Sequence, residues 1–71
     1  MDVRSEIDAT VLKIEVASGA EVAAEAVLMI LESMKMEIEV TSPAAGRVRS
    51  IAVAEGSSVR EGDVLAVLDP G

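Results

Sequence analysis

Cysteine, histidine and all three aromatic residues are absent from this 71-residue sequence. The absence of cysteine excludes a disulfide framework and a thiolate metal site. The absence of histidine removes the commonest metal ligand and general base. Because 51% of the residues are hydrophobic, Val, Ile, Leu, Ala and Met must supply the whole core of one small domain, residues 1–71. Many of them are β-branched, which favours strands over a helical bundle.

Long hydrophobic runs and clusters of positive charge are also missing. No apolar run approaches the ~20 residues that a membrane helix needs, and no basic segment precedes an apolar one as in a signal peptide. The formal net charge is −7, from 13 acidic and 6 basic residues, which repels nucleic acid phosphates. The sequence therefore predicts no nucleic-acid or membrane partner, and it fits a cytoplasmic location.

An internal repeat relates the two parts of the sequence. Residues 16–32 align with residues 53–69, an offset of 37 (53 − 16 = 37). The first copy alone is ambiguous, because Val27, Ile30 and Leu31 fall on a helical stripe among good helix formers. The second copy has two glycines and a serine pair in the same region, which makes a continuous helix improbable. We therefore predict that both copies are strand–turn–strand units, with a turn at residues 17–20.

Two such units should pack on each other about a pseudo-twofold axis, because neither can bury its apolar face alone. The predicted fold is all-β, with two small sheets facing each other in a flattened barrel. The position equivalent to Lys35 would be 72 (35 + 37 = 72), just beyond the last residue. The chain termini should therefore lie opposite Lys35. Glu25 stands where the second copy has Gly62, so the sequence alone does not establish the same turn in both copies.

The hexapeptide Glu32-Ser33-Met34-Lys35-Met36-Glu37 lies at the midpoint of the sequence, between two apolar runs. If both runs are strands, Met34 and Lys35 form the turn of a hairpin and the lysine amine projects from its tip. Methionine on both sides of a turn lysine exposes apolar area, and Asn, Asp or Gly would suit the turn better. We therefore interpret Lys35 as a covalent attachment point. The alternatives are an ordinary surface lysine and methionines that fill the core.

The acidic residues Glu32 and Glu37 bracket Lys35. With Ser33, Met34 and Met36 they are candidate recognition residues for an enzyme that modifies the lysine, although a merely solvated acidic face is the alternative. No histidine is available to activate a serine, and no general-base constellation is present. The sequence therefore predicts a chain that is not catalytic by itself and holds no metal.

This hexapeptide resembles the attachment motif of the biotinyl (biotin carboxyl carrier) domain family, in which the modified lysine lies in a Met-Lys-Met hairpin. Residues 42–48 (Ser-Pro-Ala-Ala-Gly-Arg-Val) and residues 53–65 also resemble segments of that family. The resemblance covers essentially the whole chain. It implies a barrel–sandwich hybrid of two four-stranded sheets, with biotin joined by an amide to Nζ of Lys35.

The resemblance also implies partners. A biotin protein ligase would attach biotin, and the arm would then serve a biotin carboxylase and a carboxyltransferase of a biotin-dependent carboxylase. Two other functions stay open. One is an unmodified adaptor domain of the same fold. The other is a lipoyl carrier, although lipoyl domains have an Asp-Lys-Ala type hairpin and Met34 and Met36 favour biotin.

Overall fold

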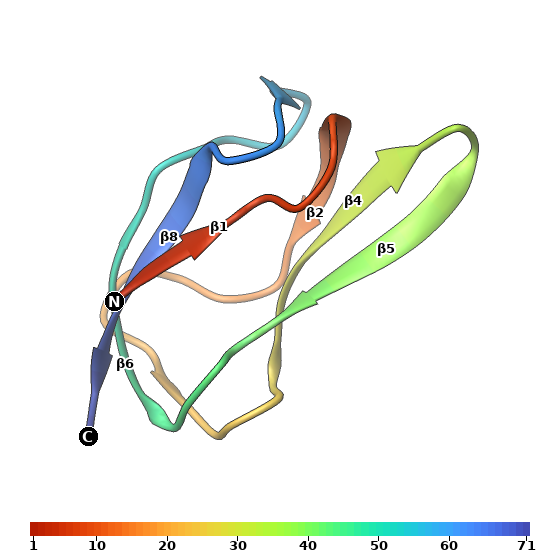
Figure 1. Ribbon diagram of the computed structural model, residues 1–71. Helices are drawn as coiled ribbons and strands as arrows, with labels where there is room; N and C mark the ends of the chain where they lie inside the picture. Colours follow the sequence, from red (N-terminus) through yellow and green to blue (C-terminus); the bar gives the residue numbers. More distant parts are fainter.

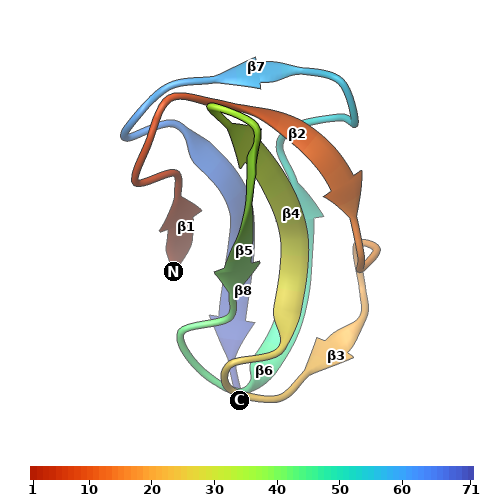
Figure 2. The ribbon, with the colours of Figure 1, turned by 90° about the vertical axis from the view of Figure 1, so that its right-hand side faces the viewer.

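Eight β-strands and no helix make up the computed structural model, which describes residues 1–71. The strands are β1 (Asp2–Arg4), β2 (Ala9–Ile14), β3 (Glu21–Val22), β4 (Val27–Ser33), β5 (Met36–Thr41), β6 (Gly46–Ile51), β7 (Ser58–Val59) and β8 (Val64–Pro70). They form two antiparallel four-stranded sheets, ordered β1-β8-β6-β3 and β5-β4-β2-β7, which face each other (Figure 2). The predicted barrel–sandwich hybrid is thereby confirmed. No helix is present that could cross a bilayer.

The segment with the ambiguous helical stripe forms strands and a turn. Residues 21–22 are β3, residues 23–26 turn, and β4 begins at Val27. β4 is an inner strand that pairs with β2 on one side and β5 on the other. Its Leu28, Met29 and Leu31 are buried, and the β4–β5 pairing is irregular between Val27 and Met29. A buried apolar run that pairs with a strand on each side is typical of an inner strand. The prediction of strands and a turn, which was drawn from the repeat, is therefore confirmed.

Equivalent hydrogen bonds related by the 37-residue offset confirm the pseudo-twofold repeat. The Gly62 amide donates to the Ser5 carbonyl at 2.8 Å, and the Glu25 amide donates to the Ser42 carbonyl at 2.8 Å. Both serines are buried, and the hydroxyl of each donates to the carbonyl two residues further on, at 2.6 and 2.7 Å. Glu25 has φ of 70° where Gly62 has 91°, so the two copies form the same turn.

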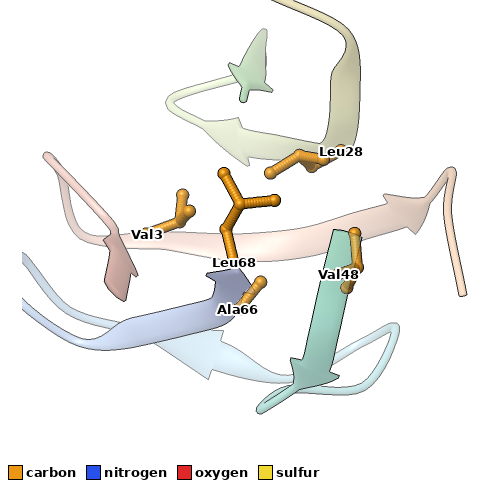
Figure 3. Packing of buried hydrophobic residues seen from close by; sticks show 5 residues of the cluster. All are labelled: Val3, Leu28, Val48, Ala66 and Leu68. Carbon is orange, nitrogen blue, oxygen red and sulfur yellow. The ribbon is translucent and has the colours of Figure 1, made fainter. Parts of the chain in front are cut away.

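The hydrophobic core consists of two clusters of five residues, and the 37-residue offset maps four residues of each cluster onto four of the other. One contains Val3, Leu28, Val48, Ala66 and Leu68 (Figure 3). The other contains Val11, Met29, Leu31, Val59 and Leu65. In Figure 3, Leu28 of β4 points across the sandwich toward Leu68 of β8. Each cluster takes side chains from both copies, so neither copy could bury its apolar face alone.

The β4–β5 hairpin and the chain termini lie at opposite ends of the elongated molecule, which measures 34 × 17 × 16 Å. Figure 1 shows the hairpin tip at the right, and both termini at the left. The predicted placement is therefore confirmed. Its cause is the symmetry: the second copy of the hairpin position falls where β8 ends.

Candidate functional site

The β4–β5 hairpin closes with a two-residue loop. Ser33 pairs with Met36 across the strands, so Met34 and Lys35 alone form the turn. Their φ angles are 53° and 66°, the pattern of a type I′ turn, which matches the right-handed twist of the strands. Residues other than Gly and Asn rarely adopt this left-handed backbone conformation, which costs them about 1–2 kcal/mol each. The hairpin therefore holds its tip in a strained but well-defined conformation.

The two methionines beside Lys35 are not core residues. Met34 is 90% exposed and Met36 is 65% exposed, whereas Met29 on the same hairpin is completely buried. The exposed apolar area expected of Met34 and Met36 is therefore present, and the alternative that they fill the core is excluded; Met29 fills the core instead. An exposed apolar pair of this kind is expected where another molecule covers it.

Lys35 is exposed, and its ammonium group has no partner within the chain. The four ion pairs of the structure engage Arg4, Lys13, Arg47 and Arg49 with neighbouring carboxylates. None of the side-chain hydrogen bonds reaches Lys35 either. The tip therefore presents a free primary amine to solvent, which, once deprotonated, is a nucleophile that can form an amide.

Glu32 and Glu37 face each other across the hairpin on its outer side, one residue pair from the turn. Both are exposed, and neither forms an ion pair. Like charges directly opposite each other in a sheet are mildly destabilising. Ser33 is half-buried at the end of β4. The structure therefore brings all six residues of the hexapeptide together at one end of the molecule, with two uncompensated acids beside the exposed methionines.

No pocket surrounds Lys35. A groove of about 300 Å³ lies between the free edges of β1 and β5, and its lining includes Val3, Ile38 and Val40 but no residue of the hexapeptide. The sequence alone does not predict this groove, because its walls come from two edge strands, β1 and β5, of different sheets. No group of three or more acidic side chains is arranged to hold a metal ion. The geometry thus suits a tip that enters another protein's site.

A protein-family model described as "biotin-requiring enzyme" matches residues 2–68, which include the whole β4–β5 hairpin. The chain belongs to this biotin/lipoyl attachment family. Its fold agrees: a long-chain acyl-CoA carboxylase that is a single-chain, multi-domain protein has a similar region, with a TM-score of 0.95 and 32% identity over 100% of this chain and 7% of that one. The family consists of carrier domains of multi-enzyme complexes.

Relatives of this biotin/lipoyl attachment domain include a protein named as biotinylated and a protein named for a dihydrolipoyllysine residue. The "biotinylated protein TB7.3 homolog" of Mycobacterium leprae is 45% identical over 94% of both chains. The dihydrolipoyllysine-residue acetyltransferase component of the pyruvate dehydrogenase complex of Azotobacter vinelandii is 40% identical over 89% of this chain, which spans 10% of that protein. These similarities show that the chain belongs to the attachment family, but they do not show whether the attached group is biotin or lipoate.

Proposed function

We propose that this protein is a biotin carboxyl carrier. In this proposal a biotin protein ligase acylates Nζ of Lys35, and the biotinylated hairpin then serves the biotin carboxylase and the carboxyltransferase of a biotin-dependent carboxylase. The observation that carries the proposal is the unpaired, exposed Lys35 at the tip of a two-residue turn. Bound biotin would supply a ureido group that carries carboxylate; the chain supplies the tether.

The geometry of the tip suits such a tether. Both turn residues have positive φ, so the two-residue loop closes tightly and Lys35 lies beyond the last paired residues, Ser33 and Met36. Because no pocket encloses Lys35, a group attached there extends into solvent without obstruction. A flexible arm on a small rigid domain raises the effective concentration of its cargo at two separate active sites. The same features support a carrier and offer nothing for catalysis by the chain itself.

The choice of biotin rests on Met34 and Met36 together with the relatives. The two exposed methionines match the hairpin of biotinyl domains rather than the Asp-Lys-Ala type. The Mycobacterium leprae relative, which is named as a biotinylated protein, is similar over nearly its full length. A lipoyl carrier is the second candidate, supported by the similarity to the Azotobacter vinelandii acetyltransferase component. An unmodified adaptor domain is a third, favoured by no observation of its own.

The chain contains two lysines, which supply a matched control for the decisive experiment. The protein is incubated with biotin, ATP and biotin protein ligase, and its intact mass is measured. We expect the mass of one biotinyl group in the parent chain and in Lys13→Arg, and none in Lys35→Arg. Lys13 lies on β2 and is ion-paired with Glu15 at 3.3 Å, so it should not compete for the ligase.

A parallel incubation uses lipoate, ATP and lipoate protein ligase. Lipoylation of Lys35 without biotinylation would replace the proposed function with the lipoyl carrier. A folded protein that takes up neither group would leave the adaptor domain as the remaining function. Because Lys35 is exposed and unpaired, Lys35→Arg should unfold at the same temperature as the parent chain, so loss of modification would not reflect loss of the fold.

A further inference from the structure

The four methionines are the side chains of this protein that peroxides oxidise most readily, because cysteine, histidine and aromatic residues are absent. Their exposed fractions differ widely in the structure. Met29 is completely buried in the core, Met1 is 53% exposed, Met36 is 65% exposed and Met34 is 90% exposed. Susceptibility to oxidation follows exposure. The most accessible thioether in the molecule is therefore the immediate neighbour of Lys35.

The side chains of Met34 and Met36 are largely open to solvent. Neither side chain belongs to a core cluster or packs against one. Met34 occupies the first position of the two-residue turn, and Met36 is the first residue of β5. The two thioethers thus flank the lysine amine on both sides along the chain, at the part of the molecule that stands furthest from the termini (Figure 1).

We propose that Met34 and Met36 form an oxidation site that controls modification of Lys35, an inference that rests on the proposed function. The oxidant is a hydroperoxide. The sulfur lone pair attacks the terminal peroxide oxygen, a sulfur–oxygen bond forms and the oxygen–oxygen bond breaks. Sulfur loses two electrons and the peroxide gains them. The departing oxygen leaves as water or an alcohol after it takes up a proton, and the methionine becomes a sulfoxide.

The sulfoxide changes the surface that surrounds Lys35 without changing the strands. A protein that reaches the amine from the hairpin tip has to cover the side chains beside it, and covering an apolar thioether is favourable. A sulfoxide is polar and accepts hydrogen bonds, so covering it without a donor is unfavourable. Oxidation therefore weakens the binding of a modifying enzyme to the surface around Lys35. Methionine sulfoxide reductases, which act on one epimer each, would reverse the change.

The first measurement maps oxidation on the unmodified chain and is independent of biotin. The protein is titrated with hydrogen peroxide, and each methionine is followed by peptide mass spectrometry. We expect one oxygen atom on Met34 first and on Met36 next, while Met29 stays unoxidised until the protein is denatured. Oxidation of Met29 together with Met34 in the folded protein, or an unreactive Met34, would overturn the proposed site.

The second measurement compares the rates at which biotin protein ligase modifies oxidised and untreated protein. We expect oxidation to lower the rate about tenfold or more, because the ligase loses the apolar contact that it makes when it covers Met34 and Met36. Treatment with both sulfoxide reductases should restore the rate. The double variant Met34→Leu/Met36→Leu retains Met1 and Met29 and should be modified at the same rate before and after peroxide.

Equal rates for oxidised and untreated parent protein would overturn the control of Lys35. A peroxide-sensitive double leucine variant would also overturn it, because the effect would then come from Met1 or from damage elsewhere. If the untreated chain takes up no biotin at all, the proposed function fails and control of biotinylation fails with it. The peroxide map would still decide separately whether Met34 and Met36 are the oxidation site.

Discussion

Glu25 and Gly62 occupy equivalent turns in the two copies of the repeat, with φ of 70° and 91°. Their amides donate equivalent 2.8 Å hydrogen bonds to the carbonyls of Ser42 and Ser5. Glycine adopts this left-handed conformation without steric cost, whereas a residue with a side chain costs about 1–2 kcal/mol there. The first copy therefore forms the turn because the surrounding hydrogen bonds and strands impose it.

The two ends of the molecule differ in charge compensation. Asp69, near the end of β8, forms an ion pair with Arg49 at 3.2 Å. Its equivalent in the first copy is Glu32, which faces Glu37 across the hairpin and forms no ion pair. The acid at this position of the repeat is therefore ion-paired in the second copy, as Asp69, and unpaired in the first copy, as Glu32. The hairpin end keeps both free acids and exposed methionines, which is typical of a surface that meets another protein.

The largest expected effect concerns Gly46, whose equivalent in the first copy is Ala9. A Cβ on Gly46 would lie 2.2 Å from the Asp69 carbonyl oxygen and 2.8 Å from Cα of Pro70, both backbone atoms. Gly46→Ala should therefore lower the free energy of unfolding by about 2–3 kcal/mol, as overpacking does. Chemical denaturation measures this loss, and hydrogen exchange should locate it at the β6–β8 pairing.

The matched control is Ala9→Gly, because the first copy accommodates a methyl group at the same point of the repeat. It should cost only about 0.5–1 kcal/mol, the ordinary penalty for glycine in a strand. Equal losses from the two substitutions would mean that the close approach to β8 has no energetic weight. The two copies would then not differ in how closely their backbones pack at this position.

A smaller effect is expected at the equivalent turns. Gly62→Ala should lower the free energy of unfolding by about 1 kcal/mol, because no atom lies within 4 Å of the added Cβ and only the backbone conformation is penalised. Glu25→Gly should raise it by about 0.5–1 kcal/mol, since the strain is relieved but the unfolded chain becomes more flexible.

Thermal unfolding can resolve these changes, because 1 kcal/mol shifts the midpoint of a domain of this size by about 4–8 °C. The two variants should move the midpoint in opposite directions. A Glu25→Gly variant that unfolds at a lower temperature than the parent would show that the exposed Glu25 side chain contributes more than its backbone strain costs.

The smallest effect concerns the facing acids. Glu37→Gln removes the like-charge pair with Glu32 and should stabilise the fold by about 0.2–0.5 kcal/mol at low ionic strength. The gain should shrink as salt is added, because exposed charges are screened. Glu39→Gln is the control, since Glu39 faces Ile30 rather than an acid. The interpretation would be contradicted if Glu39→Gln stabilised the protein as much as Glu37→Gln under the same conditions.

The sequence by itself determined the all-β class and the pseudo-twofold repeat. Two glycines and a serine pair in the second copy argued against the helix that the first copy alone allowed. The same repeat placed Lys35 opposite the termini, because the equivalent position lies beyond residue 71. Such predictions succeed because strand patterning and turn residues are local signals, and two copies of one pattern reinforce each other.

Only the tertiary structure decided the turn at Glu25, the exposure of Met34 and Met36, and the close approach of β8 to Gly46. It also decided which acids face each other, because that depends on the strand register, and a shift of one residue would turn every side chain to the opposite face. These features depend on contacts between residues far apart in the chain. No local pattern encodes such contacts, so they are settled only when the two copies pack together.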